Sequence, residues 1–351
     1  MAQARSSRLH STTTQMLRTA GATQAAGHAV VIGLNAAIVS VWDETPHVLV
    51  VAREEQSSDA TEGLPFGPFE PLSHRTLESG LRSWVEEQTA LEMGYVEQLY
   101  TFGDRGRHEV KPGEGPRVVS VGYLALTRAL KREPPVPGTS WRSWYLNFPW
   151  EDWRKAEPSL LADVIRPRLE EFVAAGGAAS ERELRSERVR LTFGFGGAGW
   201  DEEKVLERYE LLYEAGLVDE ALRDGRQVPK SGALPTGSLG QAMIFDHRRI
   251  LATAMGRLRG KLKYRPVIFE LMPPAFTLFE LQRTVEGISG VRLHKQNFRR
   301  LVENGGLVER TGRIAASGVG RPAEQFRFRR EVLRERPAPG VKLSSPRRGR
   351  A

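Results

Sequence analysis

Hydrophobic residues in the last third of the chain recur every three to four positions, which is the period of an amphipathic helix. This pattern predicts helices over residues 245–262, 278–287 and about 292–303, and Pro266 marks the end of the first. The pattern then changes to two short strand-like runs on either side of a glycine- and serine-rich stretch. The last third is therefore predicted to consist of three helices and a hairpin.

The second predicted helix carries signals at its start and its end. Thr277 stands where an N-cap is expected, and Glu280 follows three residues later, which is the spacing of a capping box. A short turn that contains two glycines, residues 287–290, separates this helix from the next. Two helices joined by a tight glycine-containing turn predict a helix-turn-helix.

The third predicted helix has an apolar face and a polar, cationic face. The residues expected to face the core are Leu293, Phe298, Leu301 and Val302. The residues expected to face outward are Lys295, Gln296, Arg299 and Arg300. A helix fits the major groove of DNA, where Arg, Lys and Gln side chains read base edges. We therefore expect these four residues to contact DNA, together with Thr277 at the start of the preceding helix.

The hairpin that follows has the features of a wing. Its strands are predicted over residues 307–314 and 322–329, with a tip at 315–320. Arg310, Arg313 and Arg321 lie on or beside this tip, in position to contact phosphates or the minor groove. A helix-turn-helix followed by such a hairpin predicts a winged helix-turn-helix domain.

The charge of the chain is concentrated in this region. Residues 240–351 contain 24 Lys and Arg against 9 Asp and Glu, a net +15, so the other residues carry −7 of the formal +8. This asymmetry indicates that only the basic part faces a polyanion such as DNA. The alternative is a winged helix that serves only as a protein–protein module, and the outward cationic cluster counts against it.

Composition excludes several other classes of chemistry. The 351 residues include no cysteine, which excludes disulfides, thiolate metal sites and a cysteine nucleophile, and which fits a reducing cytoplasm. The most apolar run, residues 29–42, is too short to span a membrane. The length and a hydrophobic content of 40% are typical of two soluble globular domains.

The first two thirds of the chain mix strands and helices. Strand-like runs occupy residues 30–41, 47–53 and 118–127. Helices are expected over residues 76–91 and near 158–175 and 201–222. Strands around a helix indicate an α/β (α+β) domain. An aromatic segment, residues 141–153, could cover a pocket of this domain or a dimer interface, with core packing as the default expectation.

These patterns divide the chain into five predicted segments. They are a disordered tail over 1–27, an α/β domain over 28–223, a linker over 224–240, the winged helix-turn-helix domain over 241–333 and a disordered basic tail over 334–351.

Residues 64–94 resemble a damaged Nudix box, G-x5-E-x7-R-E-U-x-E-E-x-G-U with U an apolar residue. The residues in register are Arg82, Trp84, Glu86, Glu87 and Ala90. The departures are Ser83 for the Glu after the Arg, Thr89 for the last Gly, His74 for the early Glu and Gly67 displaced by one position. Nudix enzymes hold Mg²⁺ with several carboxylates on one helix. We therefore expect weakened metal binding, no required cofactor and no catalytic residues.

A Nudix-like domain followed by a winged helix resembles the NrtR family, the Nudix-related transcriptional regulators of bacterial NAD metabolism. The resemblance covers residues 29–330, and its most specific stretches are 101–109, 118–127, 208–221, 246–282, 297–312 and 320–328. It implies a homodimeric cytoplasmic regulator, usually a repressor, of genes for NAD synthesis or salvage. It also implies that the Nudix-like domain binds ADP-ribose and that this binding releases a palindromic operator.

The resemblance also implies an effector pocket. Its residues would be Arg53, Arg82, Glu86, Glu87, Phe102, Arg105 and Arg107. Arg105 and Arg107 would meet phosphates, since guanidinium forks match phosphate oxygens.

Two other functions remain open from the residues alone. One is an active Nudix hydrolase of ADP-ribose-type substrates with a basic accessory domain, which would need the carboxylate that Ser83 replaces. The other is an interaction protein with no DNA role, for which Arg299 and Arg300 would be dispensable.

Overall fold

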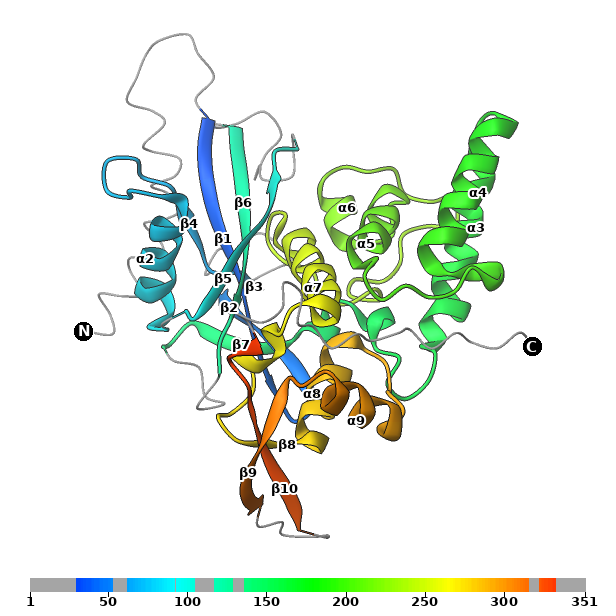
Figure 1. The fold of residues 1–351 in the computed structure, drawn as a ribbon. Helices are drawn as coiled ribbons and strands as arrows, with labels where there is room; N and C mark the ends of the chain where they lie inside the picture. The colour runs from blue at the N-terminus through cyan, green and yellow to red at the C-terminus, as the bar shows by residue number, and fades with distance from the viewer. Residues whose placement is uncertain are drawn as a thin grey trace. The chain divides into compact units, whose positions relative to one another are not determined.

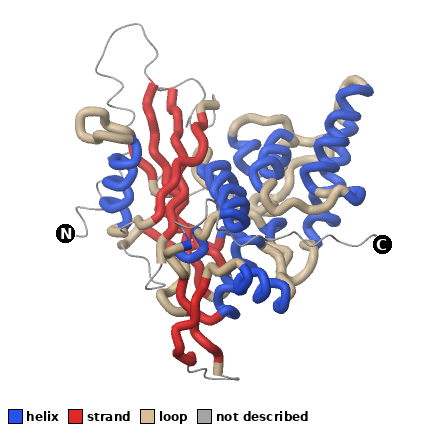
Figure 2. The backbone as a smooth tube through the Cα atoms, viewed as in Figure 1, coloured by secondary structure: helices blue, strands red, loops and turns tan. Residues whose placement is uncertain are grey.

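The computed structural model describes residues 30–52, 62–91, 93–104, 117–128, 136–315 and 322–332 (Figures 1 and 2). They form two compact units, described separately below. The first unit takes the described residues of Met1–Val39, His47–Phe148 and Tyr209–Ala254. The second unit takes those of Ser40–Pro46, Pro149–Arg208 and Met255–Ala351. The predicted effector residues Arg53, Arg105 and Arg107 and the predicted wing residue Arg321 lie outside the described residues.

A mixed sheet dominates the first unit (Figure 2). Its main path runs in the order β3-β2-β1-β6-β5, while β4 pairs with β1 and β7 with β2. The strands are β1 (Val30–Trp42), β2 (Thr45–Ala52), β3 (Glu62–Gly63), β4 (Phe66–Pro68), β5 (Tyr95–Phe102), β6 (Arg117–Leu126) and β7 (Thr139–Ser143). The β1–β6 ladder is parallel, whereas β5 is antiparallel to β6. The predicted α/β class of this part is therefore confirmed.

Helix α2 (Leu77–Thr89) carries the Nudix-like box and closes the core beside this sheet. It begins at an N-cap, Thr76, whose hydroxyl oxygen accepts a hydrogen bond from the Ser79 N–H at 3.0 Å. Leu81 and Val85 on its buried face pack with core residues of the strands. The helix predicted over 76–91 is confirmed. It could be predicted because the spacing of its apolar residues is a local feature of the sequence.

Helical segments complete the first unit. They are α6 (Asp219–Arg223) and the described first-unit parts of α5 (Val205–Glu214) and α7 (His247–Tyr264). Arg248 of α7 is fully buried, and its guanidinium donates to Glu220 Oε2 at 3.1 Å and to the carbonyl oxygens of Asn147 and Leu239. Residues 224–240, which the sequence assigns to a linker, contain no helix or strand and are mostly exposed, and they group with this unit, in which Leu239 and Gly240 are buried. The predicted boundaries between the segments of the chain, including those of the linker, stay predictions.

The second unit contains the winged helix. Helices α8 (Leu278–Ser289) and α9 (Lys295–Asn304) are followed by the antiparallel hairpin of β9 (Val308–Ala315) and β10 (Ala323–Phe328). Strand β8 (Phe276–Thr277) pairs with β10 and completes a three-stranded sheet. The predicted winged helix-turn-helix is therefore confirmed, with one correction. Gly287 lies inside α8, and the turn begins at Gly290, whose φ of 76° favours glycine.

Further helices of the second unit differ from the prediction. The segment predicted over 158–175 is a π-helical turn, Leu161–Ile165, that continues into α3 (Arg166–Ala174). Helix α4 (Ala179–Phe193) was not predicted, because its sequence is largely charged and Leu184 and Leu191 are exposed. No helix in the described residues is long and apolar enough to cross a membrane.

The aromatic segment 141–153 contributes to both units as core. Trp144 and Phe148 are fully buried in the first unit, and Trp150 is fully buried in the second. The default expectation of core packing is therefore confirmed for these three side chains.

Candidate nucleic-acid interface

The capping box predicted at the start of α8 is present. The Thr277 hydroxyl oxygen accepts from the Glu280 N–H at 3.1 Å, while Glu280 Oε2 accepts from the Thr277 N–H at 2.7 Å. Thr277 is only 8% exposed, and its hydroxyl also donates to Glu280 Oε2. Its polar groups are thus used within the cap, and we remove Thr277 from the expected DNA contacts.

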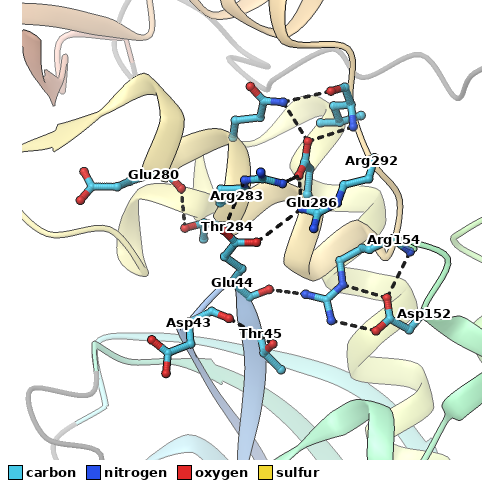
Figure 3. Close-up of polar contacts among 12 residues, drawn as sticks. Asp43, Glu44, Thr45, Asp152, Arg154, Glu280, Arg283, Thr284, Glu286 and Arg292 are labelled. Carbon is cyan, nitrogen blue, oxygen red and sulfur yellow. Dashed lines mark hydrogen bonds and ion pairs between the residues drawn. The ribbon is translucent and has the colours of Figure 1, made fainter. Parts of the chain in front are cut away.

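A buried carboxylate, that of Glu286, fixes the turn between the two helices (Figure 3). Glu286 accepts hydrogen bonds from the Leu293 N–H at 3.0 Å and from Gln282 Nε2 at 2.8 Å. It also accepts from Arg283 Nη1 at 2.9 Å and from Arg292 Nη1 at 2.6 Å. These contacts hold the chain that enters α9 against the last turns of α8.

The charge of Glu286 depends on these donors. Burial opposes ionisation, but the hydrogen bonds from the Leu293 N–H, Arg292, Gln282 and Arg283 outweigh it and lower the pKa of the Glu286 carboxyl. The hydrogen bond to Glu286 in turn raises the pKa of the Arg292 guanidinium above its ordinary value. Glu286 is therefore ionised at neutral pH, and it anchors two arginines.

Helix α9 divides into faces as its sequence predicts. Phe298 and Val302 are buried, whereas Leu293 and Leu301 are only partly covered. The four residues expected to face outward are all exposed: Lys295, Gln296, Arg299 and Arg300. The helix thus presents a cationic surface of the composition that reads base edges in a major groove.

The wing adds further cationic side chains. Arg310 and Arg313 on β9 are exposed. Arg310 Nε lies 3.5 Å from Glu324 Oε1 on β10, and the Arg310 side chain is 70% exposed, so it is accessible to another anion. The β10–β8 ladder pairs Gln325 with Thr277, so the wing is connected by main-chain hydrogen bonds to the start of α8.

A buried ionic triad lies elsewhere in the second unit. Glu151 accepts from Arg208 Nε at 2.6 Å and from Arg259 Nη1 at 2.5 Å, and all three side chains are fully buried. Arg259 Nε also donates to the carbonyl oxygen of Ile288, near the end of α8, at 2.9 Å. Burial opposes ionisation of Glu151, but the charges and hydrogen bonds of Arg208 and Arg259 outweigh it and lower the pKa of this carboxyl. The triad therefore supports the C-terminal end of α8.

The Nudix-like helix presents an incomplete set of carboxylates. Glu86 and Glu87 are exposed on α2, as is Ser83, which replaces the missing carboxylate. Arg82 is held by Glu78 and by the carbonyl oxygen of Met93, to which its Nη1 donates at 2.7 Å. The described residues contain no group of three or more His, Asp or Glu side chains placed to hold a metal ion.

Phe102 does not present a face on which a ligand ring can stack. Its side chain is 1% exposed, it meets Tyr100 edge to face, and the Arg249 guanidinium lies 5.1 Å from its ring centroid. We therefore place Phe102 in the core and remove it from the expected effector contacts.

The displaced glycine of the box, Gly67, has a packing role. A Cβ at Gly67 would lie 2.3 Å from the ring of Trp84, and that ring is fixed because its Nε1 donates to the Pro68 carbonyl oxygen at 2.7 Å. We expect Gly67→Ala to lower the free energy of unfolding by about 1–3 kcal/mol, the usual cost of overpacking. Urea denaturation measures this. Gly103→Ala is the control, since a Cβ there meets nothing closer than 3.9 Å, and an equal loss in both variants would contradict the prediction.

Comparison with known proteins identifies the region that carries this surface. Residues 268–328 match the family described as "NrtR DNA-binding winged helix domain". These residues are similar to NrtR DNA-binding winged helix domains. The NrtR match covers α8, α9 and the described strands of the wing.

One curated relative extends this finding. The "ADPR responsive transcriptional repressor NtrR" of Acinetobacter baylyi is 43% identical over 86 residues. The aligned region is 24% of this chain and spans only 34% of the relative's length.

Solved structures of NrtR proteins are also similar to this chain. Shewanella oneidensis NrtR in complex with a 27mer DNA has a TM-score of 0.49 at 20% identity, over 86% of this chain and 95% of that one. The Nudix domain of the same protein with ADP-ribose has a TM-score of 0.29 at 24% identity, over 49% of this chain and 96% of that one.

Proposed function

We propose that this protein is a DNA-binding transcriptional repressor whose Nudix-like domain responds to ADP-ribose. The observation that carries the proposal is the exposed cationic face of α9 in an NrtR winged helix domain. The ADP-ribose response is supported by the Acinetobacter relative, which is described as an ADPR-responsive transcriptional repressor. The regulated genes would be those of NAD synthesis or salvage in a bacterial cytoplasm.

Repression would depend on a homodimer. Two α9 helices about one DNA turn apart would bind the halves of a palindromic operator. ADP-ribose would release the DNA only if it binds the DNA-free arrangement more tightly than the DNA-bound one. The effector contacts that we propose among the described residues are Glu86, Glu87 and Arg82, with Arg53, Arg105 and Arg107 as further candidates.

Fluorescence anisotropy with DNA from upstream of the organism's NAD-synthesis genes tests the proposal. We expect salt-dependent, sequence-specific binding that ADP-ribose weakens, because phosphate contacts release counterions and the effector favours the DNA-free form. Specific binding that is indifferent to ADP-ribose would overturn the effector assignment. Absence of specific binding to every such fragment would overturn the regulator itself.

We propose further that the Nudix-like domain senses ADP-ribose without hydrolysing it. Ser83 supplies no carboxylate at the position where the box requires one, and Mg²⁺ binding would be weak as a result. Incubation of the full chain with ADP-ribose and Mg²⁺, followed by chromatography of the products, tests this proposal. Sustained formation of AMP and ribose 5-phosphate would show that the domain hydrolyses ADP-ribose, and it would overturn the proposal.

A further inference from the structure

A turn formed by residues 43 and 44 meets the helix-turn-helix within the second unit (Figure 3). Glu44 Oε1 lies 3.3 Å from Arg283 Nε, and Glu44 Oε2 lies 3.5 Å from Arg292 Nη1. The main chain of the turn is held as well, since Arg154 Nη1 donates to the Glu44 carbonyl oxygen. Gly287 permits this approach, because a Cβ there would lie 2.5 Å from the same oxygen.

Arg283 and Arg292 therefore each pair with two glutamates, one buried and one exposed. Glu286 is buried, and its contacts to the two guanidinium groups are 2.9 and 2.6 Å long. Glu44 is 40% exposed, and its contacts are longer at 3.3 and 3.5 Å. The Glu286 contacts fix the arginines, whereas the Glu44 carboxylate is the partner that another anion can replace.

The two arginines lie where a helix-turn-helix meets the DNA backbone. Arg283 is on α8, and Arg292 precedes the first residue of α9 by three positions. In such domains the first helix crosses the backbone, and the N-terminal end of the second enters the major groove. Arg292 is 43% exposed, so its guanidinium is accessible to a phosphate.

The charges agree with this placement. Arg283, Arg292 and the buried Glu286 carry one net positive charge, and Glu44 neutralises it. Guanidinium groups are the side chains that pair best with phosphate oxygens. A phosphodiester of the DNA backbone would restore at this position the ion pair that Glu44 provides.

We propose that Arg283 and Arg292 bind a DNA backbone phosphate and that Glu44 competes with this phosphate for them. The proposal rests on the function proposed above. If Glu44 competes with the phosphate, it lowers the affinity for DNA. Residues 43 and 44 then regulate the interface without contacting a base. A purely structural role for Glu44 predicts the opposite, since its loss would then loosen the arginines and weaken binding.

The test compares Glu44→Gln with Asp43→Asn in the full chain. Both variants remove one negative charge from the same turn, and both replace a carboxylate with its amide at a positive φ, 60° and 48°. The Asp43 carboxylate points away from Arg283 and Arg292 in Figure 3, which makes Asp43→Asn the matched control. Affinity is measured by anisotropy across a salt series, on an operator fragment and on a duplex of random sequence.

We expect Glu44→Gln to bind both duplexes roughly two- to five-fold more tightly than Asp43→Asn, the range set by one exposed ion pair. Arg292→Gln should bind both duplexes more weakly and should reduce the slope of log K against log salt by about 0.9, the value for one phosphate contact. In the Glu44→Gln/Arg292→Gln double variant, the gain from Glu44→Gln should shrink. Unfolding curves of all variants establish that they are folded.

Three outcomes would overturn the proposal. If the wild-type chain binds DNA and Glu44→Gln binds no more tightly than Asp43→Asn, the competition fails and the proposed function stands. If the wild-type chain binds neither duplex, the proposed function fails and the phosphate site fails with it. An Arg292→Gln variant that is folded and retains the wild-type salt slope would refute the phosphate contact directly.

Discussion

Replacement of both Arg299 and Arg300 by glutamate is expected to lower DNA affinity by roughly 30-fold or more, since each base contact of this kind contributes about 1–3 kcal/mol. Both side chains are exposed on α9 and make no ion pair or side-chain hydrogen bond with another described residue. Their reversal therefore adds repulsion at the DNA surface while the buried face, with Phe298 and Val302, stays unchanged. Anisotropy measures the affinity, and thermal unfolding shows that the fold persists.

The control for this double variant must change the net charge equally. Arg75 and Lys230 are exposed in the first unit, so Arg75→Glu/Lys230→Glu alters the charge of the chain by the same amount without changing a residue of the winged helix. We expect this control to change DNA affinity by only a small factor, since neither residue belongs to the DNA-binding surface that we propose. Equal effects in the two double variants would show a non-specific charge effect. No effect in either would favour a protein–protein role for the winged helix.

Glu151→Gln is expected to lower the free energy of unfolding by about 3–5 kcal/mol, the usual cost of removing one partner from a buried ion pair. The substitution leaves the fully buried guanidinium groups of Arg208 and Arg259 without their counter-charge. It also weakens the support of α8 at Ile288, whose carbonyl oxygen accepts from Arg259. Urea denaturation at neutral pH measures the loss.

The loss of stability in Glu151→Gln is expected to depend on pH. The pKa of Glu151 is lowered in the folded protein, so its stabilising effect is complete above the unfolded value of about 4.3 and is lost as the pH falls below it. The difference in stability between wild type and Glu151→Gln should therefore narrow in acid. Glu187→Gln is the control, because it removes an exposed pair with Arg190 and should leave unfolding nearly unchanged. Equal losses in both variants would contradict the role of burial.

Features set by local sequence were predictable, and features set by packing were not. The capping box of Thr277 and Glu280 and the faces of α9 follow from residues a few positions apart. Helix α4 was missed because its apolar stripe is weak, and α8 runs past Gly287 because packing overrides the low helix propensity of glycine. The hydrogen bond from buried Arg248 to the Leu239 carbonyl oxygen, near the end of the predicted linker, has no local signal in the sequence.

In the candidate site, too, local features could be predicted from the sequence and long-range contacts could not. Exposure of Lys295, Arg299 and Arg300 followed from helical periodicity. Sequence reasoning missed Glu44, which meets Arg292 across 248 residues of chain, and periodicity offers no signal for such a contact. Glu286 had a weak signal in its position four residues after Gln282, a spacing that places both side chains on one helix face.

The hydrogen bonds to the Glu286 carboxylate affect which residues of the proposed regulator can be substituted. Four donors, including the Leu293 N–H, contact this one carboxylate, so a single substitution there would remove a hydrogen-bond partner from all four at once. The exposed residues of α9 have no such dependence, and each can change without disturbing the turn. Under the proposed function, single substitutions on this face would change base preference, whereas a change at Glu286 would alter how α9 is held against α8.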